Sequence, residues 1–211
     1  MKTDCVSEFM PNELSIGDLL GELSSESPAP GGGSVAALSG CFGAALVSMV
    51  CKLSIGKKKY EEFKDELKGV LNEAKILRKA LLYLSKRDVE AFNEVMAAIK
   101  IPDREEKKEQ LQIAYKMAAN VPFEVAKRCL RVMELAEVTT QKGNRNAITD
   151  SSVGALMAYS GVKGSVLNVK VNLKYIEDKH FNTEIRDEIE NLERRAEEVL
   201  GSVIGKVESS F

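Results

Sequence analysis

The 25 residues from Ser27 to Cys51 restrict the fold more than any other part of the sequence, because they include no charged side chain. Their number would suffice to cross a bilayer. Glycine and proline fill the first third, however, and most of the remaining side chains are small. Small side chains let helix backbones approach closely, so we expect a buried central helix over about residues 35–55, packed on all sides, rather than a membrane anchor. A single chain of this length cannot always supply enough helices to surround this central helix. We therefore expect a homo-oligomer, in which a second subunit supplies the missing neighbours.

Apolar residues at steps of three and four predict helices along most of the chain. The segment Val166–Leu173 alternates as a strand would, but no second strand is available to pair with it, so we expect a helix there too. The expected fold is a single all-α domain over residues 1–211, an up-and-down helical bundle. The expected helices span about residues 14–23, 35–55, 60–99, 103–141, 149–159 and 181–207, with Ser34 and Asp103 as N-caps, Pro122 as a kink and Thr149 or Asp150 at a helix start.

The composition excludes several classes of protein. Thirty basic and 32 acidic residues leave no overall field that would attract nucleic acid. His180 is the single histidine, so an HExxH metalloprotease and a Ser-His-Asp triad are both excluded. The four cysteines form no CxxC pair, which argues against structural zinc and thioredoxin-like chemistry. We therefore expect no metal and no nucleic-acid partner.

Two of the cysteines, Cys41 and Cys51, lie in the apolar run and are expected to be buried small hydrophobes rather than nucleophiles. The N-terminal segment carries Asp4 and Glu8 and lacks the apolar core of a signal peptide. A cytoplasmic, reducing compartment is therefore expected.

Two local features suggest a ligand site. Gly31–Gly33 lacks the GK[ST] ending of a P-loop and the preceding strand of a dinucleotide fold, so no nucleotide is expected. These glycines either form a flexible connector or bring bare backbone N–H groups to an anion at a helix start. Asp88 falls in the middle of the apolar stripe of its helix, by 100° per residue. It is either an ion-paired or helix-capping residue, or a carboxylate that lines a cavity and performs acid–base chemistry.

At this point the sequence resembles a family, the cyclodeaminase domain of formiminotransferase-cyclodeaminase and the stand-alone methenyltetrahydrofolate cyclohydrolases. The resemblance covers about residues 14–178, and the ordered set of motifs is specific although each motif alone is weak. The motifs are Pro28–Ala37, Gly43–Leu46, Gly56–Tyr60, Asp88–Phe92, Ala118–Pro122, Gly143-Asn144 with Thr149-Asp150, and Asn168-Val169 with Asn172-Leu173.

The resemblance implies an all-helical homodimer that acts on tetrahydrofolate one-carbon adducts without a metal or nucleotide. The cyclodeaminase reaction closes 5-formiminotetrahydrofolate to 5,10-methenyltetrahydrofolate with loss of ammonia. The cyclohydrolase reaction opens the methenyl ring with water to give 10-formyltetrahydrofolate. Since no formiminotransferase domain is expected in the chain, we expect no internal channelling of a formimino group. The cyclohydrolase reaction, the cyclodeaminase reaction and a diverged activity therefore all stay open.

Carboxylates suit both reactions, since both need proton transfer at nitrogen and stabilisation of a cationic carbon. Asp88 and Asp150 are therefore the candidate catalytic residues, with an N-cap as the alternative role of Asp150. Asn144 and Asn146 are explained equally well as turn residues, and the lysines as a solvated loop. The candidate substrate-binding residues are Gly31, Gly32, Gly33, Ser34, Lys57, Lys58, Lys59, Asn144, Asn146, Asn168 and Asn172, of which the asparagines suit a pterin edge and the lysines the glutamate tail of folate.

A second hypothesis comes from another functional class. The chain would then be a helical dimer that binds a folate or another small ligand without converting it. A turnover assay separates this hypothesis from the enzymatic one.

Overall fold

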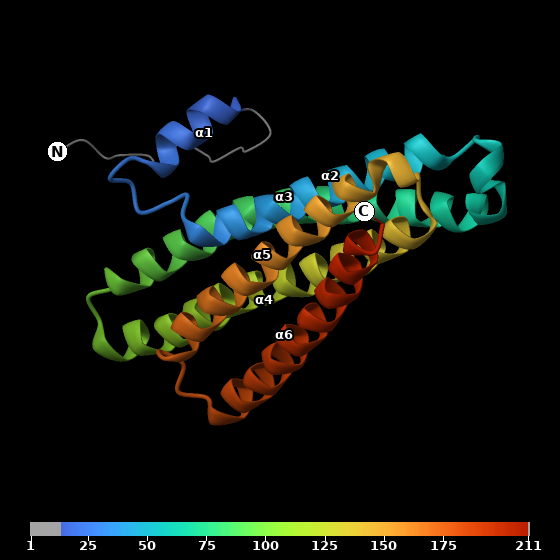
Figure 1. The fold of residues 1–211 in the computed structure, drawn as a ribbon. Helices are drawn as coiled ribbons and strands as arrows, with labels where there is room; N and C mark the ends of the chain where they lie inside the picture. The colour runs from blue at the N-terminus through green and yellow to red at the C-terminus, as the bar shows by residue number, and fades with distance from the viewer. Residues whose placement is uncertain (1–13, 211) are drawn as a thin grey trace.

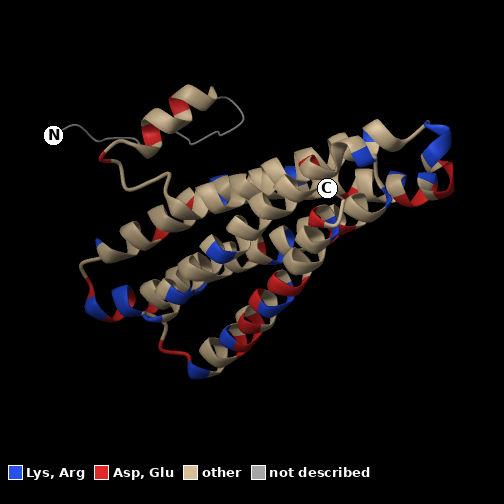
Figure 2. Cartoon of the chain, in the orientation of Figure 1, with Lys and Arg blue, Asp and Glu red and all other residues tan. Residues whose placement is uncertain are grey.

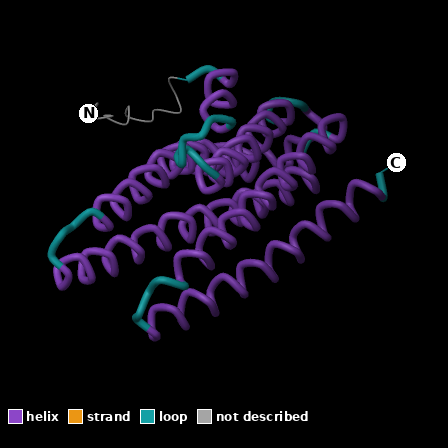
Figure 3. The backbone as a smooth tube through the Cα atoms, turned by 90° about the vertical axis from the view of Figure 1, so that its left-hand side faces the viewer, coloured by secondary structure: helices purple, strands orange, loops and turns teal. Residues whose placement is uncertain are grey.

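The computed structural model describes residues 14–210, and over that range it contains helices and no strand (Figures 1 and 3). The expectation of an all-α fold is therefore confirmed. The elements are α1 (Ile16–Leu23), α2 (Gly32–Ser54), the 3-10 helix η1 (Lys58–Phe63), α3 (Lys64–Ile99), α4 (Arg104–Lys142), the 3-10 helix η2 (Arg145–Ala147), α5 (Ile148–Leu173) and α6 (Lys179–Glu208).

The long helices run in alternating directions, as expected for an up-and-down bundle, and α6 is inclined to α2, α3 and α4 (Figure 1). Helix α2 contacts α3, α4 and α5, and α6 packs against α4 and α5. The short helix α1 contributes no buried residue and stands apart from the bundle (Figure 1). The core consists of small and branched apolar side chains, with Leu67, Leu81 and Met133 among the largest that are fully buried.

Helix α2 is buried on the side that faces its neighbours and exposed on the other. The expectation of packing on all sides is therefore wrong for the single chain. Val35, Phe42 and Met49 are exposed along the outer side of α2. Within residues 14–210, α2 is also the one helix long and apolar enough to span a membrane, although 61% of that window is buried inside the bundle, as in core helices.

Three expected helix boundaries differ from the structure. Helix α2 begins at Gly32 with Gly31 as its N-cap, so Ser34 lies in the first turn and is not the cap. The segment before Lys64 is the 3-10 helix η1 rather than the start of α3. Helix α5 begins at Ile148 and continues to Leu173, so the ambiguous segment 166–173 is helical as expected. Asp103 does cap α4 through its side chain, and α4 continues through Pro122.

The cysteine expectation is tested in part. Burial raises the pKa of both Cys41 and Cys51 to about 12, which makes either thiol a poor nucleophile near neutral pH. Cys51 is fully buried and Cys41 is half-buried. Cys5 and the segment with Asp4 and Glu8 lie outside the described residues.

Helices α2 and α5 approach closely where two glycines face each other. A Cβ atom added at Gly43 would lie 2.6 Å from the carbonyl oxygen of Gly154, and one at Gly154 would lie 3.2 Å from the carbonyl oxygen of Gly43. Glycine at position 154 avoids a tight contact with the backbone of α2. Close packing of this pair therefore sets the spacing of the two helices.

We expect Gly43→Ala to destabilise the protein by about 1–3 kcal/mol, because the new methyl group must push the α5 backbone away. Gly201→Ala in α6 is the matched control, since nothing lies within 4 Å of an added Cβ there. The control should be stabilised by roughly 0.5–1 kcal/mol through helix propensity. Urea unfolding midpoints measure both variants, and equal midpoints would contradict the account of the close approach.

Candidate active site

The first turn of α2 receives its capping partner from another helix. Gly31, the N-cap, has no side chain to cap the turn. Asp88 of α3 takes this place, and its Oδ2 lies 3.0 Å from Ser34 Oγ. The Ser34 hydroxyl also lies 3.1 Å from the carbonyl oxygen of Ser85, so one proton is shared between two acceptors. Both serines are fully buried.

Gly33 makes the approach of Asp88 possible. A Cβ atom at position 33 would lie 2.1 Å from Asp88 Oδ1, closer than any real contact allows. The interpretation of the glycines as a flexible connector is therefore wrong for Gly33, whose backbone contacts the Asp88 carboxylate. Asp88 lies at the N-terminal, positive end of the α2 dipole, where a negative charge is stabilised.

Asp88 has the environment of an acid–base group. Its side chain is half-buried. Desolvation raises the pKa of this carboxyl above the ordinary aspartate value, and hydrogen bonds from the side chain and backbone of Ser34 oppose that rise. Asp88 therefore contacts the first turn of a neighbouring helix and retains access to solvent, while its acid–base role stays a prediction.

Asn168 and Asn172 of α5 lie at the same end of α2. A Cβ atom at Gly32 would be 3.9 Å from Asn168 Nδ2. That amide nitrogen donates to the carbonyl oxygen of Gly164 at 2.8 Å, and Asn172 Nδ2 donates to the carbonyl oxygen of Ala118 at 2.8 Å. Within residues 14–210 neither amide oxygen has a hydrogen-bond partner, so both remain free to accept from a ligand.

The remaining candidates lie at the other end of α2. Asp150 and Asn168 are 18 residues apart on α5, which places them about 27 Å apart on the same side of the helix. Because Asn168 adjoins the start of α2, Asp150 lies far from Asp88. Lys57–Lys59 are exposed beyond the C-terminus of α2, at the same end as Asp150. One chain therefore does not bring the two candidate catalytic carboxylates together.

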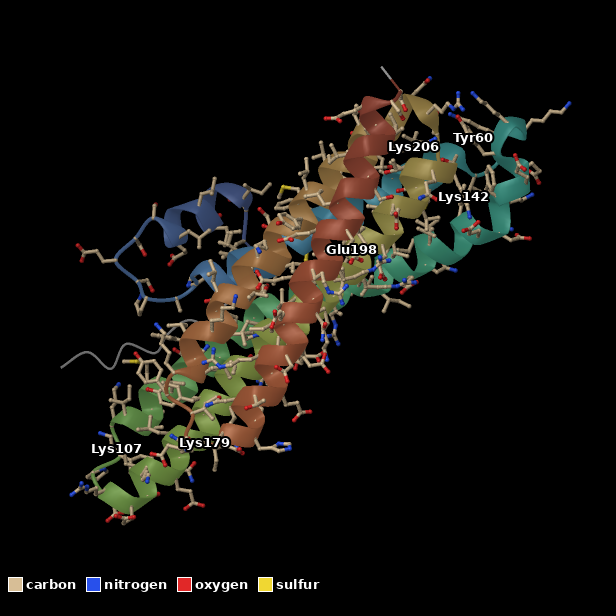
Figure 4. All side chains as sticks on the ribbon, turned by 60° about the horizontal axis from the view of Figure 1, so that its bottom comes forward. Tyr60, Lys107, Lys142, Lys179, Glu198 and Lys206 are labelled. Atoms are coloured by element: carbon tan, nitrogen blue, oxygen red, sulfur yellow. The ribbon has the colours of Figure 1, made fainter. Side chains whose placement is uncertain are left out.

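Asp150 lies in the first turn of α5 but does not cap it. Ala147 is the N-cap, and within the described residues the side chain of Asp150 makes no hydrogen bond. The N-cap alternative is therefore wrong. A hollow of about 530 Å³ lies beside this turn, between the α4–α5 connection and the end of α6 that carries Lys206, a residue labelled in Figure 4. Its lining includes Asn146, Thr149 and Lys206 but not Asp150.

Asn144 is a structural residue rather than a free binding group. It is buried, and its backbone N–H donates to Ser54 Oγ at 2.8 Å. Its Oδ1 accepts from Tyr60 Oη at 3.3 Å and from the backbone of Asn146 at 3.1 Å. The turn interpretation is therefore confirmed for Asn144, which fixes the α4–α5 connection to the end of α2. Asn146 is exposed and remains a candidate.

We expect Asn144→Ala to cost about 1–3 kcal/mol of stability, because Tyr60 Oη and the Leu53 carbonyl oxygen would lose a buried partner. Asn146→Ala removes a nearby exposed amide and should change the free energy of unfolding by less than about 0.5 kcal/mol. Thermal or urea unfolding compares the two. A loss of the same size in both variants would argue against the structural role of Asn144.

Sequence reasoning missed Ser85 and Tyr60. Ser85 stands one helical turn before Asp88 on the same side of α3, so helical phase alone could have paired them. Tyr60 Oη accepts from the backbone N–H of Arg145, 85 residues away, and no local pattern indicates such a contact. In the described part of the chain, no group of three or more His, Cys, Asp or Glu side chains could hold a metal ion.

The described residues thus form an all-helical bundle with a half-buried carboxylate held at a glycine-rich helix start. A model of the family described as formiminotransferase-cyclodeaminase matches residues 15–191. The chain therefore belongs to this family.

Comparisons with individual proteins agree. The chain is 43% identical to the methenyltetrahydrofolate cyclohydrolase of Methylorubrum extorquens, covering 87% of this chain and 90% of that protein. It is 29% identical to the formimidoyltransferase-cyclodeaminase of Rattus norvegicus, covering 93% of this chain but only 37% of that longer protein. The crystal structure of formiminotetrahydrofolate cyclodeaminase from Thermotoga maritima matches with a TM-score of 0.88 and 30% identity, covering 94% of this chain and 98% of that one.

Proposed function

We propose that this protein is a folate one-carbon enzyme that hydrolyses 5,10-methenyltetrahydrofolate to 10-formyltetrahydrofolate. The carrying observation is Asp88, a half-buried carboxylate with a raised pKa at the glycine-rich start of α2. The choice of hydrolysis is supported by the 43% identity to a methenyltetrahydrofolate cyclohydrolase over nearly its whole length.

Asp88 acts first as a base in this proposal. Water adds to the cationic methenyl carbon, a new C–O bond forms, and the carboxylate accepts the proton that the water releases. The negative charge of Asp88 also stabilises the cationic carbon before attack. The bond from that carbon to N5 then breaks, Asp88 returns its proton to N5, and the hydroxyl proton leaves to solvent as the formyl group forms on N10.

The binding residues have complementary tasks. The free amide oxygens of Asn168 and Asn172 accept from N–H groups at the pterin edge. Lys57–Lys59 attract the anionic glutamate tail. No metal or nucleotide takes part in this scheme, and tetrahydrofolate enters as the carrier of the one-carbon unit.

Two further expectations belong to the proposal. The active form is a homodimer, which is supported by the exposed apolar side of α2. The protein works in the cytoplasm.

Cyclodeamination is the second candidate reaction, and the match to the structure of a formiminotetrahydrofolate cyclodeaminase favours it. The two reactions are separated by assaying loss of the methenyl form and release of ammonia from 5-formiminotetrahydrofolate side by side. The proposal expects the first rate to exceed the second. Faster ammonia release would reverse the assignment, and tight folate binding without either product would favour the non-catalytic hypothesis.

The pH dependence of kcat/KM provides a separate prediction. Because burial raises the Asp88 pKa, the acid limb of the profile should have its inflection above the ordinary aspartate value. Below that pKa the carboxyl group is protonated and cannot accept a proton, so activity falls as the pH falls. An acid limb at the ordinary aspartate pKa would contradict the role of Asp88 as the base.

A further inference from the structure

A second hollow, of about 570 Å³, lies between the start of α4 and the connection from α5 to α6. Figure 4 shows Lys107, which lines this hollow, at the end of the bundle opposite Lys206. None of the candidate catalytic or substrate-binding residues is part of its lining. The proposed function therefore gives this hollow no role. We call it the α4 hollow.

Two stacked tyrosines form one wall of the α4 hollow. The ring centroids of Tyr115 and Tyr175 are 5.0 Å apart, and the ring planes are inclined by 17°. Tyr115 is half-buried against the core. Tyr175 is still 55% exposed although one face of its ring lies on Tyr115, so the opposite face is open to a ligand. An offset stack on this face suits a further aromatic ring.

The connection that carries Tyr175 is held firmly against α4. Gln112 Nε2 donates to the carbonyl oxygen of Tyr175 at 3.0 Å, and Gln112 Oε1 accepts from the backbone N–H of Glu177 at 2.8 Å. Lys116 pairs with Asp178 at 2.7 Å. The backbone is therefore fixed on both sides of the exposed ring, so a ligand that stacks there pays little to order it.

The α4 hollow has one positive charge in excess, since three basic and two acidic side chains line it. Lys108 pairs with Glu177 at 3.1 Å. Within residues 14–210, Arg104 and Lys107 form no ion pair, and Glu105 is the one remaining acid of the lining. Figure 2 shows basic side chains gathered at the start of α4. A guanidinium and an ammonium group without partners favour a carboxylate.

We propose that the α4 hollow binds a flat aromatic ring that carries a carboxylate, with the ring stacked on Tyr175 and the carboxylate paired with Arg104 and Lys107. The stacked wall selects the ring, and the excess charge selects the acid. A purely aliphatic acid would leave the open face of Tyr175 uncovered.

Two sources have this chemistry. One is the benzoyl-glutamate part of a folate substrate, because the Tyr175 backbone N–H donates to the carbonyl oxygen of Asn172 at 3.0 Å, beside a candidate pterin-binding amide. This source rests on the proposed function. The other source is a free aromatic acid that binds independently of the substrate.

Calorimetric titration with 4-aminobenzoylglutamate tests the binding without any turnover. The wild-type protein should bind this probe, and Tyr175→Ala should weaken the affinity roughly tenfold through loss of the stack. Arg104→Gln, which alters an exposed side chain, should weaken it similarly and covers the case in which Tyr175→Ala fails to fold. Tyr83→Ala is the matched control, since Tyr83 is 62% exposed on α3 and should leave binding unchanged.

Kinetics of the same Tyr175→Ala variant then distinguish the sources. A KM for the folate adduct that rises with kcat unchanged would place the benzoyl-glutamate part of the substrate here, instead of its tail on Lys57–Lys59. An unchanged KM together with lost probe binding would identify a free aromatic acid as the ligand. Both results support the proposal.

Other results would overturn it. No heat of binding with the wild-type protein, or equal affinity in the wild type and in folded Tyr175→Ala, would remove the stacking site. Glutarate, which has carboxylates but no ring, should bind more weakly than the probe, and equal affinity would show that charge alone attracts both. Absence of folate turnover in the wild type would reject the proposed function, whereas the titration would still decide this inference.

Discussion

Replacing Asp88 with asparagine is expected to slow hydrolysis of 5,10-methenyltetrahydrofolate about 10²–10⁴-fold, the contribution typical of a positioned general base. The amide is nearly the same size as the carboxylate, and its oxygen still accepts from Ser34 Oγ. The start of α2 therefore keeps a capping partner while the site loses its proton acceptor. Initial rates at saturating and low substrate measure the effect, which should appear mainly in kcat.

Asp65→Asn is the matched control, because Asp65 lies on the same helix and forms only an exposed ion pair with Lys68. Its rate should equal that of the wild type. If Asp88→Asn also kept the wild-type rate while folding normally, Asp88 would be a helix-capping residue and nothing more.

Substitution of Gly33 by alanine is expected to produce the second large effect. The new Cβ would lie 2.1 Å from Asp88 Oδ1, so the carboxylate must swing away from Ser34. Displacement of a reacting group by about 1 Å can cost roughly 10²-fold in rate. The carboxylate is the end of a side chain and can move, so the loss of stability should be modest beside the loss of activity.

Gly69→Ala on α3 serves as the control, since an added Cβ there meets nothing within 4 Å. It should leave the rate unchanged. Unfolding curves recorded for both variants separate displacement of Asp88 from general destabilisation. A fully active Gly33→Ala protein would mean that the position of Asp88 against α2 does not matter for turnover.

The sequence predicts the side of a helix on which a residue lies better than it predicts the residue that it contacts in another helix. The helical phase of Asp88 predicted a carboxylate directed toward the core, and the structure places it against α2, because phase depends on the sequence of one helix alone. Ser34 is expected as an N-cap and Asp150 as a cap or helix start, but each is the third residue of its helix. Helix α2 begins at Gly32 with Gly31 as its N-cap, and the 3-10 helix η2 directly precedes α5.

Partners far apart in the sequence could not be predicted in this way. Asn144 resembles a turn residue and a binding residue equally well until Tyr60, 84 positions earlier, is found to donate to its amide oxygen. The separation of Asp88 from Asp150 depends on which end of α2 each helix reaches, and therefore on the order in which the bundle is connected. The order of polar residues along the sequence reveals neither the contact between Asn144 and Tyr60 nor the distance between Asp88 and Asp150.

This chain is an enzyme that converts a folate one-carbon adduct. The most direct measurement is the initial rate of loss of 5,10-methenyltetrahydrofolate as a function of protein concentration, with the spontaneous rate in the same buffer subtracted. We expect a rate that increases in proportion to the protein, saturates with substrate and yields 10-formyltetrahydrofolate. A rate equal to that of buffer alone at every protein concentration would contradict it.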